Sequence, residues 1–247
     1  MMPMDYLDFA SDLPVNGRII FSSAEESEEV MRQYGVDQQL RQSSKGSFQA
    51  DCTMLETEEA ILSADRFAQA CLAHFEPPPD TVSILAFRCA GGEFLVSGEK
   101  VTEDNLVVVP HGHGTDLVFS NLAGSEGVAI PKTKYSELTE ALCPSCAQPE
   151  GLQIAKGNPR LLQGIRNSVI RIIAAAQPRD ENIDDLVARM VLTANADPWA
   201  ERPEIFYRKQ AKIDIAKQVQ TFIDENYQEQ IRIEDLCRAT ERGVRTL

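Results

Sequence analysis

Two cysteines with the spacing of metal ligands lie past the middle of the chain, in the segment Cys143-Pro144-Ser145-Cys146. A C-x-x-C pair can supply two of the four ligands of a zinc ion, or it can cycle between dithiol and disulfide. Zinc requires two further ligands, and the sequence holds no second C-x-x-C. A redox pair would open a helix after a strand, which the surrounding ALCPSCAQPEG does not resemble. We therefore expect two loop thiols without a chemical role. A metal- or redox-responsive module that uses Cys143, Cys146 and a histidine is an alternative.

A second pair of possible ligands is formed by His111 and His113, on either side of Gly112. This pattern resembles the H-x-H of cupin metal sites. Cupin enzymes add a glutamate four residues later and a third histidine from a later strand. Here position 117 is a leucine, and no histidine follows His113. We therefore expect no metal centre and no cofactor. A metal-free, cupin-like barrel would still provide a binding pocket, with Phe94, His111 and His113 as candidate ligand-binding residues.

Motifs typical of enzymes are absent from the sequence. It contains no G-x-S-x-G nucleophile elbow, no phosphate-binding G-x-x-x-x-G-K-[ST] and no H-E-x-x-H. The carboxylate runs AEESEE and PRDENIDD suit solvated helix faces better than an acid–base pair. We expect that the protein is not an enzyme.

The composition is that of a globular protein with a strong negative charge. The 247 residues are 43% apolar, and 24 Lys and Arg stand against 38 Asp and Glu, a net charge of −14. Residues 201–247 carry nine basic and nine acidic side chains, so the first 200 residues hold all of that charge. The start of the chain is acidic, and no apolar stretch approaches the ~18 residues of a membrane span. These features predict a cytoplasmic protein that has reduced thiols and does not contact a membrane.

The residues that could bind a ligand require a framework, and residues 46–135 are expected to supply it as a β-rich sensor domain. Short segments rich in β-branched and aromatic residues recur there, separated by turns such as EPPPD and HGHG. About eight strands at this spacing indicate an antiparallel sandwich or small barrel. Residues 1–45 are expected to form an N-terminal arm and one helix, over 23–34, that opens at Ser23. The predicted fold class is α+β.

Residues 136–197 are expected to form a loop and two helices. Residues 131–157 are rich in turn residues, and a helix with Pro159 at its first position follows. Both helices carry an apolar stripe. Such stripes pack against a sheet or another helix, or they form a dimer interface, and the sequence leaves both options open. The stripe residues are Leu161, Leu162, Ile165, Val169, Ile172, Ile173 and Ala176 in the first helix, and Ile183, Leu186, Val187, Met190 and Val191 in the second.

The linker candidate ANADPWAERPEI spans residues 194–205 and leads into the last segment, residues 198–247. A long helix is expected over about 206–228, followed by IRIEDLCRATERGVRTL. Glu234 and Asp235 suit the first turn of a helix, where carboxylates meet the positive end of the dipole. A turn over 241–243 and a second helix opening at Val244 would complete the outline of a helix-turn-helix.

This segment resembles the start of the first helix-turn-helix of AraC/XylS-family transcriptional regulators, whose pattern runs roughly I-t-L-x-D-L-A-x-x-x-G-v-S-x-R-x-L. This chain departs from the family pattern at Glu241, Arg242 and Gly243. The upstream layout, a β-domain followed by helices and a linker, is similar to the family's sensing and dimerisation half. The matching residues are Ile231, Ile233, Asp235, Leu236, Cys237, Arg245 and Leu247.

The resemblance implies a DNA-binding regulator that senses a small-molecule or protein effector and forms a homodimer. Arg245 and Thr246 would face DNA, and Arg242 would contact phosphate, in the intact protein. Family members carry two helix-turn-helix units, whereas this sequence ends four residues into the first recognition helix. We therefore expect that this chain alone does not bind DNA specifically. The alternative is a standalone sensor that pairs with full-length relatives. The sequence does not identify the effector, the target genes, or whether genes are activated or repressed.

Overall fold

The computed structural model of the protein describes residues 6–15, 17–90, 92–144, 151–175 and 180–195, and nearer the C-terminus residues 218–219, 221–222, 226 and 232–240. The chain divides into two compact units, Met1–Glu201 and Arg202–Leu247. The first unit contains the predicted arm, sensor domain and helices together. None of the described helices is long and apolar enough to cross a membrane.

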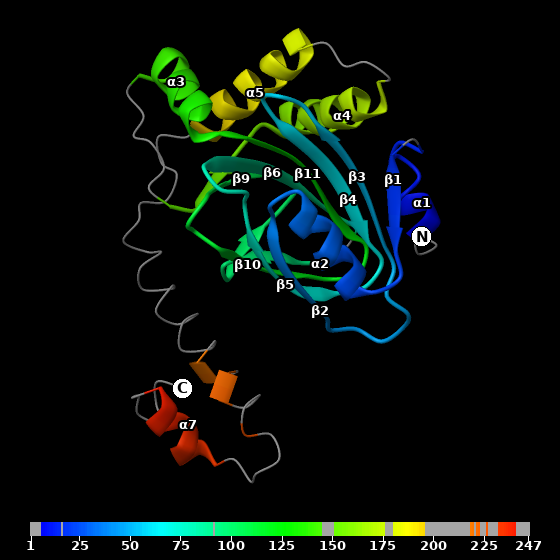
Figure 1. The fold of residues 1–247 in the computed structure, drawn as a ribbon, viewed down its shortest axis with the longest axis vertical. Coiled ribbons are helices and arrows are strands. Elements are labelled where there is room, and N and C mark those ends of the chain that lie inside the picture. Colours follow the sequence, from blue (N-terminus) through cyan, green and yellow to red (C-terminus); the bar gives the residue numbers. More distant parts are fainter. Residues whose placement is uncertain are drawn as a thin grey trace. The chain divides into compact units, whose positions relative to one another are not determined.

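Two antiparallel sheets form the body of the first unit (Figure 1). In spatial order, the larger sheet consists of β1 (Arg18–Phe21), β3 (Ala50–Glu56), β4 (Ile61–Phe67), β11 (Ala123–Pro131), β6 (Thr81–Cys89), β9 (Asn105–Pro110) and β12 (Gln153–Lys156). The smaller consists of β2 (Asp37–Gln42), β5 (Cys71–Glu76), β10 (Thr115–Phe119), β7 (Phe94–Val96) and β8 (Glu99–Val101). The α+β antiparallel sandwich is therefore confirmed, and the two sheets do not close into one barrel.

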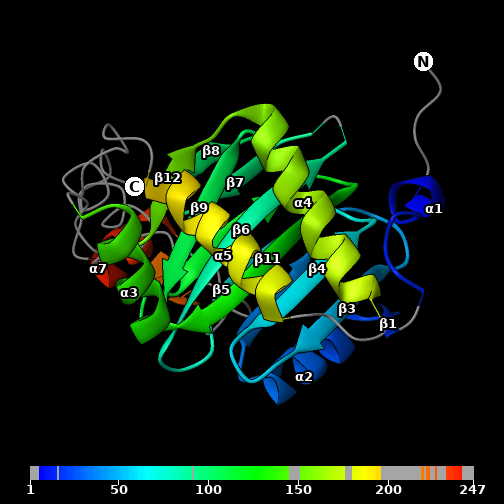
Figure 2. The ribbon, with the colours of Figure 1, turned by 90° about the horizontal axis from the view of Figure 1, so that it is seen from above.

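Three helices cover the outer face of the larger sheet, which is the face turned away from the smaller sheet (Figure 2). They are α3 (Lys132–Leu142), α4 (Pro159–Ala174) and α5 (Asp180–Asn195). The helix α2 (Ala24–Gln33) packs on β2, at the edge of the smaller sheet. The short helix α1 (Tyr6–Phe9) belongs to the N-terminal arm, and α7 (Ile233–Ala239) belongs to the second unit.

The predicted helix starts are confirmed at two places. The side chain of Ser23 accepts a hydrogen bond from the backbone N–H of Glu26 at the start of α2. At the start of α4, Asn158 accepts from the N–H of Arg160, with Pro159 at the first helical position. These caps form because the first N–H groups of a helix have no partner within it.

The apolar stripes of α4 and α5 pack against the larger sheet. The side chains of Leu162, Ile165 and Val169 are fully buried, as are those of Leu186 and Val191. They share one hydrophobic cluster with the sheet residues Leu62, Ile84, Leu106, Val128 and others. Of the two options that the sequence left open, packing against a sheet therefore accounts for the stripes. Leu161 is an exception because it is exposed to solvent, and Ala176 lies outside the described residues.

Strands also form outside the predicted β-rich region. Within residues 1–45 the chain adds β1 and β2, and within the expected loop region 131–157 it forms α3 and β12. Two of these elements, β2 and α3, are polar in sequence; β2 lies at the edge of the smaller sheet, and α3 is largely on the surface. In β2, DQQLRQ, only Leu40 is buried, and α3 buries only Tyr135 and Thr139. Alternation is therefore too weak in them to indicate a strand or helix.

Candidate functional site: a cavity between the sheets

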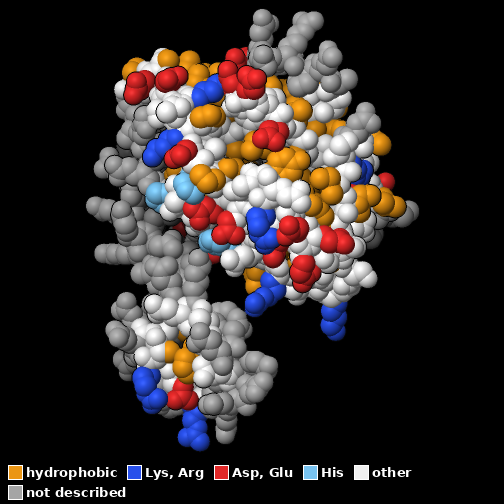
Figure 3. All heavy atoms as spheres, viewed as in Figure 1, with side chains coloured by type: hydrophobic (Ala, Val, Ile, Leu, Met, Phe, Trp, Pro, Cys, Tyr) orange, Lys and Arg blue, Asp and Glu red, His pale blue; other side chains and the backbone are white. Residues whose placement is uncertain are grey.

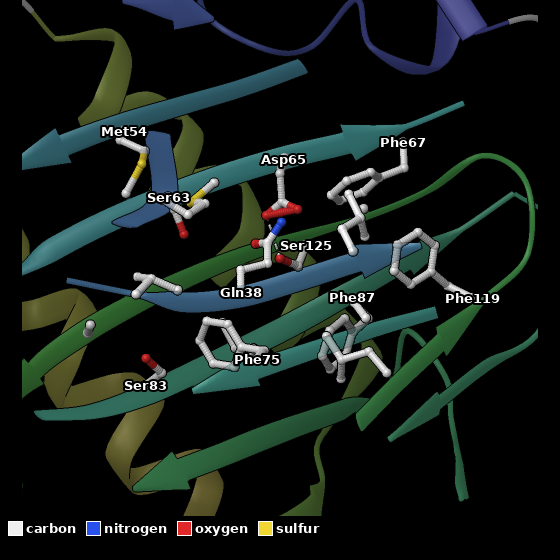
Figure 4. A pocket seen from close by; sticks show the side chains of 18 of the residues that line it. Gln38, Met54, Ser63, Asp65, Phe67, Phe75, Ser83, Phe87, Phe119 and Ser125 are labelled. Atoms are coloured by element: carbon white, nitrogen blue, oxygen red, sulfur yellow. Dashed lines mark hydrogen bonds between the residues drawn. The ribbon is translucent and has the colours of Figure 1, made fainter. Parts of the chain in front are cut away.

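A cavity with about 870 Å³ of empty space, part of it open to solvent, lies between the two sheets (Figure 4). Both sheets contribute to its wall, together with Met31 of α2, Val36 just before β2, and Pro78. Most of the remaining lining residues are apolar, including Leu40, Met54, Ile61, Phe67, Ala73, Phe75, Leu85, Phe87, Phe94, Leu117 and Phe119. A largely apolar space with a few polar groups is typical of small-molecule sites.

The alternation of β4 places different side chains on its two faces. Successive side chains of a strand point to opposite faces of a sheet. Ile61, Ser63, Asp65 and Phe67 line the cavity, as Figure 4 shows for the last three. Leu62 and Ala64 face the helices and are fully buried.

Of the described residues that line the cavity, Asp65 alone is charged. Its strand position lies opposite Ser125 of β11 and Cys52 of β3. The hydroxyl of Ser125 donates a 2.7 Å hydrogen bond to Oδ2 of Asp65 (Figure 4). In the described part of the chain, no basic side chain approaches the carboxylate within ion-pair distance. Since Asp65 lines the cavity, a bound molecule could reach it.

Burial raises the pKa of Asp65 to about 6, from an ordinary value of 3.8. The charge of Glu126 raises this pKa further, whereas the Ser125 hydrogen bond and the charge of Arg66 lower it. At neutral pH the side chain is therefore mostly a carboxylate, held in largely apolar surroundings. Such a charge is costly without a partner.

Aromatic rings form one wall of the cavity. The ring centroids of Phe87 and Phe94 are 4.1 Å apart, those of Phe94 and Phe119 are 5.4 Å apart, and those of Phe67 and Phe119 are 4.9 Å apart. All four residues line the cavity. Ring faces of this kind bind flat apolar groups and also attract cations.

The structure brings one of the three predicted ligand-binding residues to the cavity. Phe94 is buried and lines it. The two histidines do not: His111 and His113 lie between β9 and β10, exposed to solvent. The Nδ1 atom of His111 is 3.2 Å from the carbonyl oxygen of Pro77 and 3.4 Å from the carboxylate of Glu76. The sequence suggests the two histidines as ligand-binding residues because of their chemistry. Which side chains face the cavity depends instead on the pleat of the strands.

Histidines and acidic side chains gather on one face of the first unit (Figure 3). Besides the His111–Glu76 pair, Nδ1 of His74 lies 2.8 Å from the carboxylate of Asp116. Within the described ranges, however, no group of three His, Cys, Asp or Glu side chains could hold a metal ion. The His74–Asp116 contact joins β5 to β10, and the backbone N–H of Gly112 donates a hydrogen bond to the carboxylate of Glu76.

The predicted DNA-contacting residues Arg242, Arg245 and Thr246 lie outside the described residues, as do Cys146 and most of the helix expected over 206–228. What is described is α7, at the expected place. The carboxylate of Asp235 accepts a 3.0 Å hydrogen bond from the backbone N–H of Arg232, which caps the start of this helix. At its end, the hydroxyl of Thr240 donates to the carbonyl of Leu236.

The polar residues of the cavity were not found from the sequence. They are Asp65, Ser63, Ser83, Ser125 and, from the smaller sheet, Gln38. A signal was present in ILSADRF, where two adjacent charges interrupt an otherwise apolar alternation. A charge on each face of a buried strand requires a special environment on each face.

No family model and no curated protein matches this chain. Among solved structures, the AraC-like transcriptional activator CuxR is 13% identical, covers 93% of this chain and 86% of its own, and has a TM-score of 0.48. ToxT from Vibrio cholerae, in a structure with bound unsaturated fatty acid, is 9% identical, with coverages of 76% and 71% and a TM-score of 0.39. The Cnp3 cupin domain of Schizosaccharomyces pombe is 12% identical, with coverages of 40% and 72% and a TM-score of 0.28. These values are too low to assign a function or a ligand to this chain.

Proposed function

We propose that this chain is the effector-sensing and dimerisation portion of an AraC-type transcription regulator, and that it acts by binding rather than by catalysis. The observation that carries this proposal is the cavity between the sheets, apolar with a few convergent polar groups. It lies on the same chain as the C-terminal residues whose pattern resembles a helix-turn-helix. Pockets of this composition are suited to hold a small molecule in one orientation.

The wall of the cavity suggests how occupancy would be transmitted. Side chains from both sheets and Met31 of α2 line the same space. A bound molecule therefore contacts elements that are far apart in sequence. If these elements can adopt two arrangements, a bound molecule favours the one for which it has the higher affinity, and the size of the shift is set by the difference between the two affinities. In the intact protein this shift would reach the DNA-binding residues Arg242, Arg245 and Thr246, and the partner subunit of a homodimer.

Two adjacent residues of β5 provide a matched test. Ala73 lines the cavity, whereas Leu72 is 44% exposed on the other face of the strand. We expect Ala73→Phe to fill part of the cavity and Leu72→Phe to leave it open.

The experiment maps the DNA sites that the complete gene product binds in its source cells, and measures transcription next to them for the wild type and both variants. The proposal predicts reproducible sites, with effector-dependent transcription lost in Ala73→Phe and kept in Leu72→Phe. It is wrong if the product occupies no reproducible site. Equal responses in the two variants would exclude the cavity as the effector site. In a standalone dimer partner, sites would be occupied only through a relative.

A further inference from the structure

Among the described residues, the charge of Asp65 in the cavity has no partner of opposite sign. Arg66, the next residue in the chain, points to the opposite face of the sheet, where its guanidinium pairs with Asp12 and Glu126. Its Nη2 donates to the carboxylates of Asp12 and Glu126, and its Nη1 donates to the backbone carbonyls of Asp65 and Ser125, so the guanidinium does not reach the Asp65 carboxylate. The Asp65 carboxylate keeps the Ser125 hydrogen bond, which is much weaker than the hydration that it loses on burial. A cation inside the cavity would compensate that loss.

The remaining wall fits the rest of such a ligand. Phe67 follows Asp65 by two residues and faces the same side of β4, where it contacts Phe119. Phe87 and Phe94 extend the ring cluster. One carboxylate compensates only part of the hydration that a cation loses on burial, and the negative faces of aromatic rings stabilise the cation further. Apolar side chains around them favour an apolar body attached to the charged group.

We propose that the cavity between the sheets takes an organic monocation, an ammonium group attached to an apolar or aromatic body, with Asp65 as its counter-ion. The proposal rests on the proposed function and names the ligand class of the same site. Within the described part of the chain, the lining holds a single carboxylate and no basic side chain. A second ammonium group would therefore lack a partner, and a carboxylate or phosphate would be repelled.

The affinity is expected to depend on pH because Asp65 titrates. The groups that surround it are Cys52 from β3, Ser125 and Glu126 from β11, Gln38 across the cavity, and Arg66 on its own strand. Burial raises the pKa of the Cys52 thiol well above its ordinary value, so that it stays neutral. An alkylammonium group, like that of lysine, stays charged below about pH 10. Binding should therefore strengthen as the pH rises through about 6, the pKa of Asp65.

The test uses three probes with similar bodies and different heads: 2-phenylethylammonium, 2-phenylethanol and 3-phenylpropionate. Each is titrated calorimetrically into the 247-residue chain at pH 7.5, and the ammonium probe also at pH 5. The proposal predicts that the ammonium compound binds at least about tenfold more tightly than either other probe. With a pKa of about 6, roughly a tenth of Asp65 is ionised at pH 5, so the affinity should fall about tenfold there.

Two variants complete the test. Asp65→Asn keeps a hydrogen-bonding side chain without the charge and should lose the preference for ammonium, whereas Glu93→Gln removes an exposed carboxylate outside the cavity and should change nothing. Tighter binding of the alcohol or the carboxylate overturns the ligand class but leaves the cavity as a sensor. Failure of all three probes at millimolar concentration also overturns it, and the DNA-mapping experiment then decides the proposed function separately. The pH profile of the wild type tests the ligand class even if Asp65→Asn does not fold.

Discussion

Asp65 and Arg66 are adjacent in β4, and their charged groups lie on opposite faces of the larger sheet. The carboxylate faces the cavity, whereas the guanidinium is fully buried on the other face, beneath the N-terminal arm. There it forms an ion pair with Asp12 at 2.9 Å and a second with Glu126, and it lies over the ring of Phe9. Among the described residues, β4 thus carries the ion-paired charge of Arg66 on the face beneath the N-terminal arm, and the charge of Asp65, which has no ion-pair partner, on the face that lines the cavity.

The charge of Asp65 should destabilise the folded protein above about pH 6. Its pKa is about 6 in the folded protein and 3.8 ordinarily, so between these values the folded state holds a proton that the unfolded state has released. Stability from this group is present below about pH 4 and is lost as the pH rises to about 6. Asp65→Asn should therefore raise the free energy of unfolding at pH 8, by at most about 3 kcal/mol, and much less at pH 4. Urea unfolding at both pH values measures this. An equal effect at both would contradict it.

Removing Arg66 should be strongly destabilising. Arg66→Met leaves Glu126, which is fully buried, with Arg88 at 2.8 Å as its remaining partner. Loss of one member of a buried ion-pair network costs about 3–5 kcal/mol. Lys100→Met breaks the exposed pair with Glu93 and should cost less than about 1 kcal/mol. Urea unfolding at pH 7 compares the two, and similar losses would show that the Arg66 network is unimportant.

The N-terminal arm should loosen when the hydroxyl of Tyr6 is removed. This hydroxyl donates to the carboxylate of Asp51, which Arg18 also contacts at 2.9 Å. Burial and the Asp51 hydrogen bond raise the pKa of Tyr6, so the hydroxyl stays protonated. Tyr6→Phe should cost about 1–3 kcal/mol and increase hydrogen exchange at Ala10 and Leu13. Tyr34→Phe serves as a control for the loss of a tyrosine hydroxyl elsewhere. Unchanged exchange in Tyr6→Phe would refute the anchoring role.

Gly124 should not tolerate a side chain. It lies between Arg66 of β4 and Arg88 of β6 in the register of the sheet. A Cβ at this position would be 2.2 Å from the carbonyl oxygen of Asp65, so Gly124→Ala should cost about 1–3 kcal/mol. At Gly164, in the middle of α4, nothing lies within 4 Å of such a Cβ, and Gly164→Ala should stabilise by about 0.5–1 kcal/mol. Thermal unfolding checks both signs, and a stable Gly124→Ala would contradict the packing of this row.

The sequence predicts the main elements where the local signal is strong. Ser23 and the Asn158-Pro159 pair mark helix starts because capping is a local interaction. The alternation of apolar residues in the strands of the sandwich is also a local signal, so these strands are predicted as well. The polar edge strand β2 and the weakly amphipathic α3 are not predicted from the sequence, because their positions depend on contacts made after the sheets have formed.

The candidate site was harder to predict because it depends on which face of each strand is turned inward. Of the three residues that the sequence suggests for their chemistry and position, Phe94 lines the cavity, whereas His111 and His113 lie in a turn outside it. Asp65 was missed, since a charge inside a β-segment looks like a break between two strands. Only the pairing of β4 with β3 and β11 shows that Asp65 faces the opposite sheet.

The most direct test of the cavity as an effector site is nondenaturing mass spectrometry of the 247-residue chain after incubation with a small-molecule extract of its source cells. The wild type and Leu72→Phe should each retain the same small molecule, and Ala73→Phe, whose new side chain enters the cavity, should not. If no molecule is retained, or if Ala73→Phe retains it as well as the wild type does, the cavity is not the effector site.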